Sequence, residues 1–217
     1  MWRITKTILR QAQEPTKTTE AKPFDASRYA RFFERPFINQ AAGEFLFEKR
    51  HLDPRVVRWC RLTSWKNWLQ IPYFDIEGNL TGVQWRNLVA EVPRFKFPYG
   101  SQCHIYNLPV LKLLKPGEEL WIAEGCSDCW ALLSSGHKAI AIPSATLLKP
   151  KDLEVLLSLS SSSSFHMFPD ADVPGERLFL KLKELLPQLI RHQLPAGCKD
   201  YSDYYCACTE RSRSVNC

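Results

Sequence analysis

The segment that decides the fold is residues 118–144, EELWIAEGCSDCWALLSSGHKAIAIPS. It holds a short apolar run that ends at Glu124, then a helix-like stretch, then a second apolar run, AIAI. Gly136 stops the helix-like stretch, and glycine is favoured just past a helix end because it adopts the left-handed conformation freely. A strand, a helix and a second strand in this order predict a βαβ unit, whose two strands are parallel.

The same alternation continues toward the C-terminus. We expect a helix in KPKDLEVLLSL (149–159), a third strand in FHMF (165–168) and a very short fourth strand within QLPAGCKDYSDYY (193–205). Between the last two, PGERLFLKLKELLPQLIRH predicts a long amphipathic helix that is interrupted at Pro187. Strands that alternate with helices of about ten residues indicate the α/β class with a parallel sheet.

A different pattern precedes this region. Two short helices are expected in residues 45–62, separated at Asp53-Pro54, because proline is favoured in the first turn of a helix. WLQIPYFDIEGNLTGVQWRNL (68–88) holds two apolar and aromatic runs around EGN, which is a hairpin signal. The predicted organisation has four parts. A flexible arm (1–40), with a short helix near ASRYARFFER, is followed by a smaller α+β subdomain (41–115), an α/β domain (116–205) and an irregular tail (206–217).

Charge and cysteine content narrow the function classes. The 217 residues carry a formal net charge of +6, which favours polyanionic partners such as nucleic acid without requiring them. The 8 cysteines are scattered and are interpreted as reduced thiols; Cys126 and Cys129 form a C-x-x-C without the second pair that a structural zinc site needs. No apolar run predicts a membrane span or a secretory signal, although the N-terminus weakly resembles a transit peptide. We therefore expect a cytoplasmic protein without structural zinc.

Acidic residues recur where the predicted strands end. Ligands bind at the carboxyl ends of the strands in an open parallel sheet, so these side chains are expected to converge on one edge. Crowded carboxylates raise one another's pKa, and a hard divalent cation such as Mg²⁺ or Mn²⁺ removes that conflict. The alternative is that they cap helices or lie in solvent. The acids are Glu124, Asp128, Asp170, Asp172 and Asp200, with Asp203 close by.

These motifs resemble a known family. WIAEGCSDCWALLSSGHKAIAIPSA resembles the first motif of the Toprim domain, E-G-x-x-D between a strand and a helix, and FPDADVPGERLFLKL resembles its second, D-x-D-x-x-G, in the form typical of primases. LPAGCKDYSDYY is similar to the third element, a Lys-Asp after a strand. Upstream, FLFEKRHLDPRVVRWCRL, IPYFDIEGNLTGVQWRNL and PRFKFPYGSQCHIYNL resemble segments of the bacterial-type primase catalytic core. The resemblance covers residues 45–205.

The resemblance implies a fold and a set of roles. The fold would be a Toprim domain, a Rossmann-like parallel sheet with flanking helices, preceded by a smaller α+β primase-core subdomain. Glu124, Asp170 and Asp172 would be catalytic, and with Asp128 and Asp200 they would hold Mg²⁺ or Mn²⁺; Glu124 would also accept a proton. Four basic residues would contact template or nucleotide phosphates, unless those on strands are simply solvated charges: Arg86, Arg94, Lys96 and Lys199.

The implied activity is that of a DNA primase. It would make short RNA primers on single-stranded DNA from ribonucleoside triphosphates, by two-metal phosphoryl transfer. The zinc module that normally precedes such a core and the helicase-binding domain that follows it are not expected in this chain, which suits a phage or mobile-element protein and leaves a replicative helicase as an open partner. Two alternatives stay open: a Toprim nuclease, and a non-catalytic nucleic-acid-binding remnant.

Overall fold

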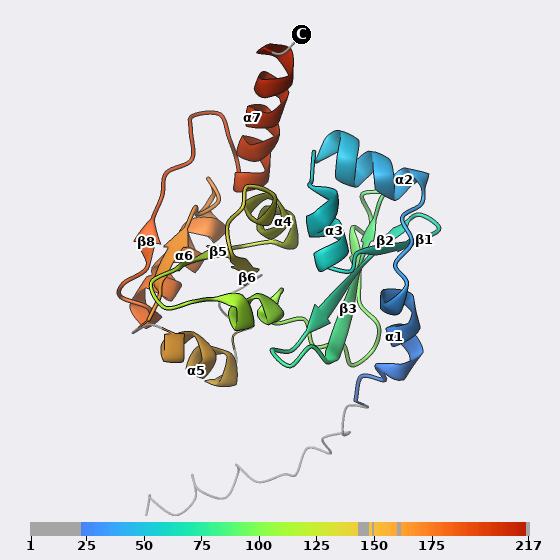
Figure 1. The fold of residues 1–217 in the computed structure, drawn as a ribbon, viewed down its shortest axis with the longest axis horizontal. Helices are drawn as coiled ribbons and strands as arrows, with labels where there is room; N and C mark the ends of the chain where they lie inside the picture. The colour runs from blue at the N-terminus through green and yellow to red at the C-terminus, as the bar shows by residue number, and fades with distance from the viewer. Residues whose placement is uncertain (1–22, 143–147, 149, 160–161, 216–217) are drawn as a thin grey trace, which may run out of the picture.

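The computed structural model describes residues 23–142, 148, 150–159 and 162–215, which form two units, each built around a four-stranded sheet (Figure 1). The first, here called the antiparallel unit, contains α1 (Ser27–Glu34), α2 (Gln40–Gly43), η2 (Glu44–Lys49), α3 (Pro54–Trp59), β1 (Thr63–Trp65), β2 (Trp68–Phe74), β3 (Leu80–Asn87) and β4 (Phe95–Lys96). The second, the parallel unit, contains η3 (Leu108–Leu113), β5 (Glu119–Ala123), α4 (Cys126–Ser134), β6 (Ala139–Ala141), α5 (Pro150–Leu159), β7 (Ser164–Met167), α6 (Val173–Leu185), β8 (Ile190–Arg191) and α7 (Tyr201–Val215).

The antiparallel unit confirms the predicted hairpin. Strands run in the order β1-β2-β3-β4 with antiparallel neighbours, and β2 pairs with β3 along its whole length. Asp75 holds the turn between them because its Oδ1 accepts a hydrogen bond from the Asn79 amide at 2.8 Å. Leu69, Ile71 and Tyr73 alternate along β2 and point into the core, so the intervening residues of β2 face the other side of the sheet.

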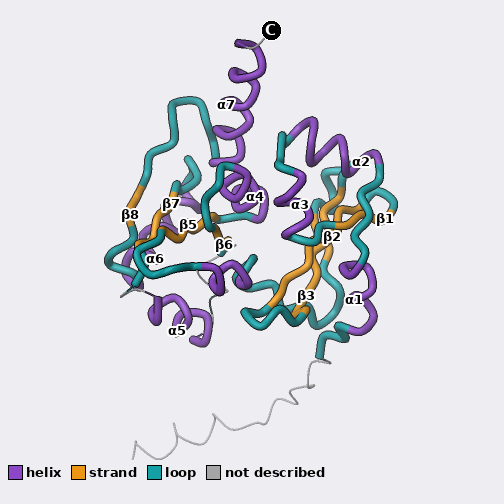
Figure 2. The backbone as a smooth tube through the Cα atoms, viewed as in Figure 1, coloured by secondary structure: helices purple, strands orange, loops and turns teal. Residues whose placement is uncertain are grey.

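The parallel unit confirms the predicted α/β class. Its strand order is β6-β5-β7-β8, and all three neighbouring pairs are parallel. One face of the sheet, which includes Leu120 and Ile122 of β5, packs with α5 and α6. The alternate residues Trp121 and Ala123 pack with α4 on the opposite face (Figure 2). Helices therefore cover both faces of the sheet, as they do in α/β folds.

Helix α4 joins the two units into one core. The same buried cluster contains Leu69 and Ile71 of β2 and Trp130 of α4. Tyr106 lies between the units: its ring is 5.2 Å from Tyr73 and 6.4 Å from Trp130, and its hydroxyl accepts a hydrogen bond from Trp130 Nε1 at 2.9 Å. The cavity described below is therefore walled by elements that pack rigidly against one another.

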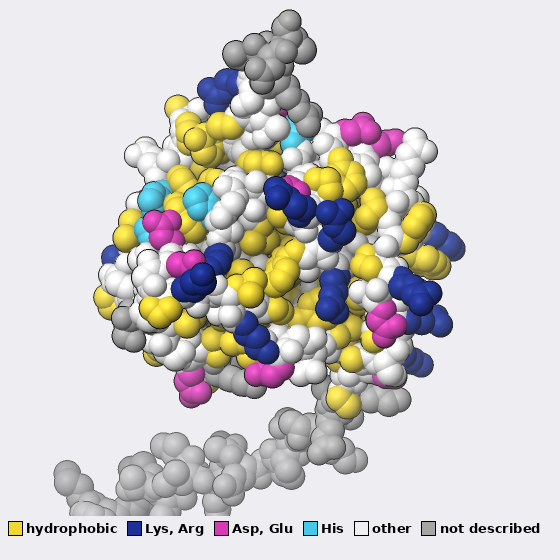
Figure 3. All heavy atoms as spheres, viewed as in Figure 1, with side chains coloured by type: hydrophobic (Ala, Val, Ile, Leu, Met, Phe, Trp, Pro, Cys, Tyr) yellow, Lys and Arg dark blue, Asp and Glu magenta, His cyan; other side chains and the backbone are white. Residues whose placement is uncertain are grey.

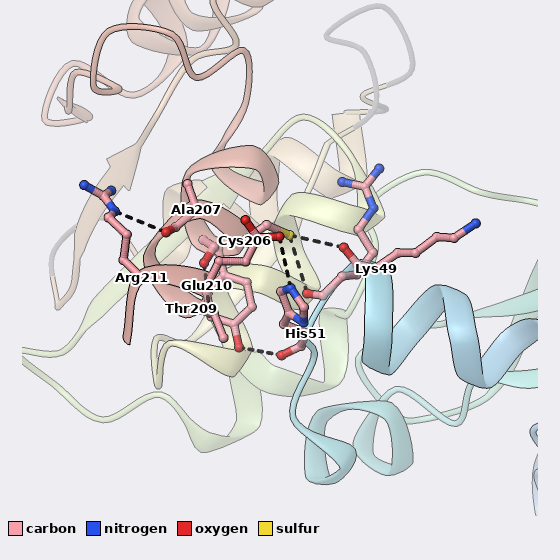
Figure 4. A network of polar contacts seen from close by, with 9 residues as sticks. Lys49, His51, Cys206, Ala207, Thr209, Glu210 and Arg211 are labelled. Carbon is pink, nitrogen blue, oxygen red and sulfur yellow. Dashed lines mark hydrogen bonds and ion pairs between the residues drawn. The ribbon is translucent and has the colours of Figure 1, made fainter. Parts of the chain in front are cut away.

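The C-terminal segment corrects the sequence prediction. The predicted irregular tail continues helix α7 as far as Val215, and only residues 216–217 of it lie outside the described part of the chain. Tyr201, Tyr204, Tyr205 and Cys208 are spaced i, i+3, i+4 and i+7, which is the spacing of one helix face. Helix α7 attaches to the antiparallel unit, because the Tyr205 hydroxyl donates to the His51 carbonyl at 2.9 Å. Figure 4 shows His51 facing Glu210, whose Oε1 lies 3.5 Å from His51 Nε2.

Other boundaries differ too. Helix α6 ends at Leu185, two residues before Pro187, and the fourth strand is β8 rather than a segment within 193–205. The predicted arm reaches too far, because Phe37 exchanges hydrogen bonds with β1, where its carbonyl accepts from the Ser64 amide at 2.8 Å. Residues 1–22 of that arm lie outside the described residues. Tyr106 and Ala141 form a β-bridge, so the parallel unit begins before the predicted boundary at residue 116.

No helix formed by the described residues is long and apolar enough to cross a membrane.

Candidate active site between the two sheets

Three loops of the parallel unit meet at the carboxyl ends of its strands. Glu124 follows β5, Asp128 lies in the first turn of α4, and Asp170 lies in the loop after β7. The third loop, between β8 and α7, carries Lys199 and Asp200. A hydrogen bond joins this loop to the loop after β7, because the Ala171 amide donates to the Lys199 carbonyl at 2.7 Å. Segments that are far apart in the sequence thus present their polar side chains together.

These side chains line a central cavity of about 320 Å³ between the two units. Glu124, Asp128, Asp170, Lys199 and Asp200 all contribute to its wall. Asp172 does not: it lines a neighbouring groove that also reaches Asp170. The structure therefore gathers four of the five predicted acids and Lys199 around one space, and leaves Asp172 at its margin.

Gly175 explains why the loop after β7 fits closely against α6. A Cβ atom at this position would lie 2.6 Å from the Asp170 carbonyl oxygen and 2.8 Å from both its Cβ and its nitrogen. Only glycine permits this approach of the first turn of α6 to Asp170. The helix start thereby fixes the position of the Asp170 backbone.

Three of the acids accept hydrogen bonds from backbone amides. Asp128 Oδ1 accepts from the Ser202 amide at 2.9 Å, and Asp200 Oδ1 accepts from the Asp203 amide at 2.8 Å. Asp172 caps α6, with its Oδ1 2.9 Å from the Gly175 amide. The capping alternative that the sequence left open therefore describes part of what these residues do. Glu124 differs, since its Oε2 is buried and has no hydrogen-bond partner among the described residues.

The carboxylates on the acidic side of the cavity crowd one another. Burial, with the added charges of Asp128, Glu124, Asp200 and Asp172, raises the pKa of Asp170 to about 8. Burial and the Asp200 charge raise the pKa of Asp128, and burial with the Asp172 charge raises that of Glu124, against the opposing effect of Lys199. Carboxylates in this condition are stabilised by a bound cation.

The donors fit a hard cation in kind, but they are not already assembled around one. Carboxylate oxygens are the ligands that Mg²⁺ and Mn²⁺ prefer, and the orphaned Oε2 of Glu124 is such an oxygen. Within the described residues, however, no three His, Cys, Asp or Glu side chains stand in a metal-binding arrangement. A cation would have to draw the carboxylates closer together than they lie here.

The antiparallel unit supplies the opposite wall of the cavity. Three arginines line this wall, and together they are here called the arginine wall. Arg50 follows the end of η2, Arg86 lies on β3, and Arg94 lies just before β4. The Arg86 guanidinium lies over the Phe45 ring at 4.7 Å and over the Phe95 ring at 5.6 Å. Burial and the neighbouring charges of Arg94 and Arg50 lower its pKa to about 10. Figure 3 shows Lys and Arg side chains gathered over the middle of this face, between the two units.

Lys96 does not join this wall. Phe95 pairs with Arg86 across the sheet, whereas Lys96 pairs with Trp85, and neighbouring residues of a strand face opposite sides. Its Nζ lies 4.6 Å from the centre of the Trp68 ring, on the far face. The structure therefore separates Lys96 from the other predicted phosphate-binding residues.

Sequence reasoning missed Arg50. Its Nη1 donates to the Ser202 hydroxyl at 2.9 Å, and the Ser202 amide in turn holds Asp128. Arg50 therefore links the arginine wall to the acidic residues through one intermediate side chain. The available signal was its place in FLFEKRHLDPRVVRWCRL, one of the segments on which the resemblance in sequence rests.

The C-x-x-C cysteines are packing residues with protonated thiols. Burial raises the pKa of Cys126 to about 12 and raises that of Cys129 as well. Cys126 Sγ lies 3.2 Å from the Tyr73 hydroxyl, and Cys129 Sγ donates to the Ala139 carbonyl at 3.4 Å. Neither is in a disulfide. Thiols of this kind do not act as nucleophiles near neutral pH.

Comparisons with known proteins assign the fold. No protein-family model and no curated protein matches the sequence. The structure is similar to the E. coli primase catalytic core, with a TM-score of 0.62 and 18% identity over 82% of this chain and 72% of that one. It is also similar to a DnaG primase catalytic domain bound to ssDNA, with a TM-score of 0.61 and 17% identity over 88% of this chain and 78% of that one. A third similar structure is the primase fragment of the bacteriophage T7 primase-helicase protein, with a TM-score of 0.61 and 14% identity over 97% of this chain and 84% of that one. The fold is therefore that of primase catalytic cores.

Proposed function

We propose that this chain is a DNA primase-like nucleotidyltransferase with a Toprim-type site, which synthesises short RNA primers on single-stranded DNA. The observation that carries the proposal is the cavity whose arginine wall faces buried carboxylates, in a fold shared with primase catalytic cores. Phosphoryl transfer needs cationic groups around the phosphates and carboxylates that hold a cation, and it needs little else from the protein. Both are present on opposite walls of one space.

In this proposal the carboxylates bind a divalent cation, and the arginines orient the phosphates. Glu124, Asp128, Asp170 and Asp200 would hold Mg²⁺ or Mn²⁺, with Asp172 at the edge of the site. When bound, the cation would stabilise the charge on the phosphates during transfer. The 3′-hydroxyl oxygen attacks the α-phosphorus of a ribonucleoside triphosphate, a new phosphodiester bond forms, and pyrophosphate leaves. Glu124 would accept the hydroxyl proton with the carboxylate oxygen that the cation leaves free.

The basic residues divide by position. Arg86 and Arg94 face the carboxylates and would contact nucleotide or template phosphates, and Lys199 would do so from the acidic side. An arginine held between two aromatic rings keeps its charge and its orientation, which suits a phosphate clamp. Single-stranded DNA and ribonucleoside triphosphates are therefore the proposed partners. The likeness to the T7 primase-helicase fragment supports a helicase as a further partner to test.

A synthesis assay tests the proposal. Pure protein is incubated with circular single-stranded DNA, labelled ribonucleotides and Mg²⁺ or Mn²⁺, beside a variant that carries Asp170→Asn and Asp172→Asn. We expect short labelled RNA from the wild type and none from the variant. A folded wild type that makes no product would contradict primase activity, and nicking of the circle would point instead to a nuclease that uses the same acids.

A non-catalytic nucleic-acid-binding protein is the second candidate. The observation in its favour is that Asp128, Asp172 and Asp200 are each engaged by a backbone amide and are not arranged around a metal position. Such a protein would bind single strands equally well in Mg²⁺ and in a chelator. Metal-dependent synthesis that Asp170→Asn abolishes would exclude it.

A further inference from the structure

A cluster of tryptophans lies on the sheet face that points away from the cavity. Trp65 pairs with Trp68 across β1 and β2, and Trp85 lies beside both, with ring centres 6.5 Å from Trp65 and 6.3 Å from Trp68. Trp68 precedes the core residue Leu69, and Trp85 precedes the cavity residue Arg86, so the indoles occupy the opposite face of the sheet. The cavity and its proposed chemistry make no use of this face.

Two lysines stand over these rings. Lys66 Nζ lies 4.6 Å from the centre of the Trp65 ring, and Lys96 Nζ lies 4.6 Å from that of Trp68. Among the described residues, neither lysine has a carboxylate within ion-pair distance. Their charges are therefore balanced by aromatic faces and solvent alone, and remain available to an anion. We call this surface the tryptophan patch: Trp65, Lys66, Trp68, Trp85 and Lys96.

The outer part of the patch is accessible and held in place: Trp65, Lys66 and Lys96 are exposed, whereas Trp68 and Trp85 are half-buried. Trp65 is 47% exposed although it is one of the largest apolar side chains. Lys66 follows it in a tight turn with a φ of 51°, and Asn39 Nδ2 fixes that turn by donating to the Lys66 carbonyl at 2.8 Å. Figure 3 shows Lys and Arg side chains gathered along the edge of the molecule where α1 and β1 lie. An exposed ring on a fixed turn beside positive charge loses little freedom when a flat ligand stacks on it.

We infer that the tryptophan patch binds single-stranded nucleic acid, with bases stacked on the indoles and backbone phosphates near Lys66 and Lys96. The chemistry matches the ligand: stacking on aromatic rings accepts any base, and cations between the rings neutralise the phosphates. Only the end of this sheet face that carries the patch reaches the surface, since Thr63, Gln70 and Val83 further along the same face are buried. The charge of the patch argues against an apolar protein surface as the occupant.

This binding differs from the proposed synthesis in one testable respect, since it needs no metal ion. We would titrate a labelled oligothymidylate of about twelve nucleotides with the protein in a chelator, and follow fluorescence anisotropy. Trp65→Leu is expected to weaken binding about tenfold, because one stacking contact is lost. The double variant Lys66→Gln, Lys96→Gln should lower the slope of log affinity against log salt by about 1.4.

The control removes two exposed lysines elsewhere, Lys112→Gln and Lys181→Gln, which changes the net charge equally. It should reduce affinity much less than the patch variant does. No measurable binding by the wild type, or equal affinities for the patch and control variants, would overturn the inference. Glu184→Gln, which removes an exposed charge of α6 outside both the cavity and the patch, should bind the oligonucleotide like the wild type. Patch-dependent binding without primer synthesis would therefore reject the proposed function and leave the patch standing.

Discussion

The two walls of the cavity hold their charges in different ways. The acids of the wall come from loops after strands and from the first turn of α4, and two of them, Asp128 and Asp200, accept hydrogen bonds from backbone amides. In the arginine wall, Arg86 lies on β3 and is held by aromatic rings, whereas Arg50 follows η2 and Arg94 precedes β4. The acidic wall is also strained electrostatically, since burial and mutual repulsion raise the pKa of Asp170 to about 8. Both walls therefore crowd like charges together, but only the basic wall has aromatic rings that hold its central side chain in place.

The largest effect is expected from Asp170→Asn. We expect primer synthesis to fall at least about a hundredfold, because a central cation ligand is lost. The same variant should stabilise the chain when no divalent cation is present. The pKa of Asp170 is raised in the folded state, so the wild type loses stability as the pH rises from about 4 to about 8. Urea unfolding in a chelator near pH 8 should show a gain on the order of 2 kcal/mol.

That gain should disappear at about pH 3, below the ordinary pKa of an aspartate, where Asp170 is largely protonated in both states. Glu184→Gln is the control, because Glu184 lies exposed on α6 and pairs only with Lys181 at 3.2 Å among the described residues. It should leave synthesis and stability near the wild-type values. A destabilising Asp170→Asn would mean that the acidic wall is not strained.

The second effect tests the arginine wall with Arg86→Met. Methionine keeps the packing between the two phenylalanines and removes the charge, so stability should change little. We expect the KM for nucleotide or template to rise about tenfold, as one charge-assisted contact to phosphate is lost. Steady-state kinetics measures this, with Arg177→Met on the exposed side of α6 as the control. Equal KM values for both variants would remove Arg86 from the binding role.

The third effect concerns the approach of α6 to Asp170. Gly175→Ala places a Cβ 2.6 Å from the Asp170 carbonyl oxygen, so the loop must shift. Thermal unfolding should show a loss of about 1–3 kcal/mol, and synthesis should fall with it. Gly43→Ala is the matched control, because the nearest atoms to its new Cβ lie 4.0 Å away. It should be neutral or slightly stabilising; an equal loss in both variants would contradict the tight fit at Gly175.

The smallest effect separates capping from metal binding at Asp172. Asp172→Ala removes the cap on the Gly175 amide and should cost about 1 kcal/mol, whereas Asp172→Asn keeps an acceptor oxygen and should unfold like the wild type. If Asp172 serves the site, Asp172→Asn nevertheless loses synthesis. Wild-type synthesis by the Asn variant would make Asp172 a helix cap alone. Urea unfolding and the synthesis assay together decide this.

The spacing of apolar residues and the position of turn residues were enough to predict most of the fold. The hairpin at 68–88 and the parallel sheet followed from local patterns, and both are confirmed. Helix α7 was missed because its polar residues hide the stripe of Tyr201, Tyr204, Tyr205 and Cys208. The position of strand β8 was missed because a two-residue strand has no pattern of its own.

The candidate site was predictable where strand ends determine it. Glu124, Asp128, Asp170 and Asp200 converge because the carboxyl ends of parallel strands share one edge. Lys96 was predicted to lie beside Arg94 because residues two apart on a strand face the same side. Arg94, however, precedes β4 and is not part of the strand, whereas Lys96 lies in β4 and points to the far face. Arg50 was missed because its contact with Ser202 joins segments that are 152 residues apart, which local patterns do not encode.

Manganese binding tests the central claim most directly, because it asks whether the acidic wall holds a cation without relying on synthesis. Free Mn²⁺ is measured by electron paramagnetic resonance in titrations of the wild type, Asp170→Asn and Glu184→Gln. We predict that the wild type and Glu184→Gln bind Mn²⁺ and that Asp170→Asn binds it at least about tenfold more weakly. Equal binding by all three proteins, or none by the wild type, would contradict the account of this cavity as a metal-dependent active site.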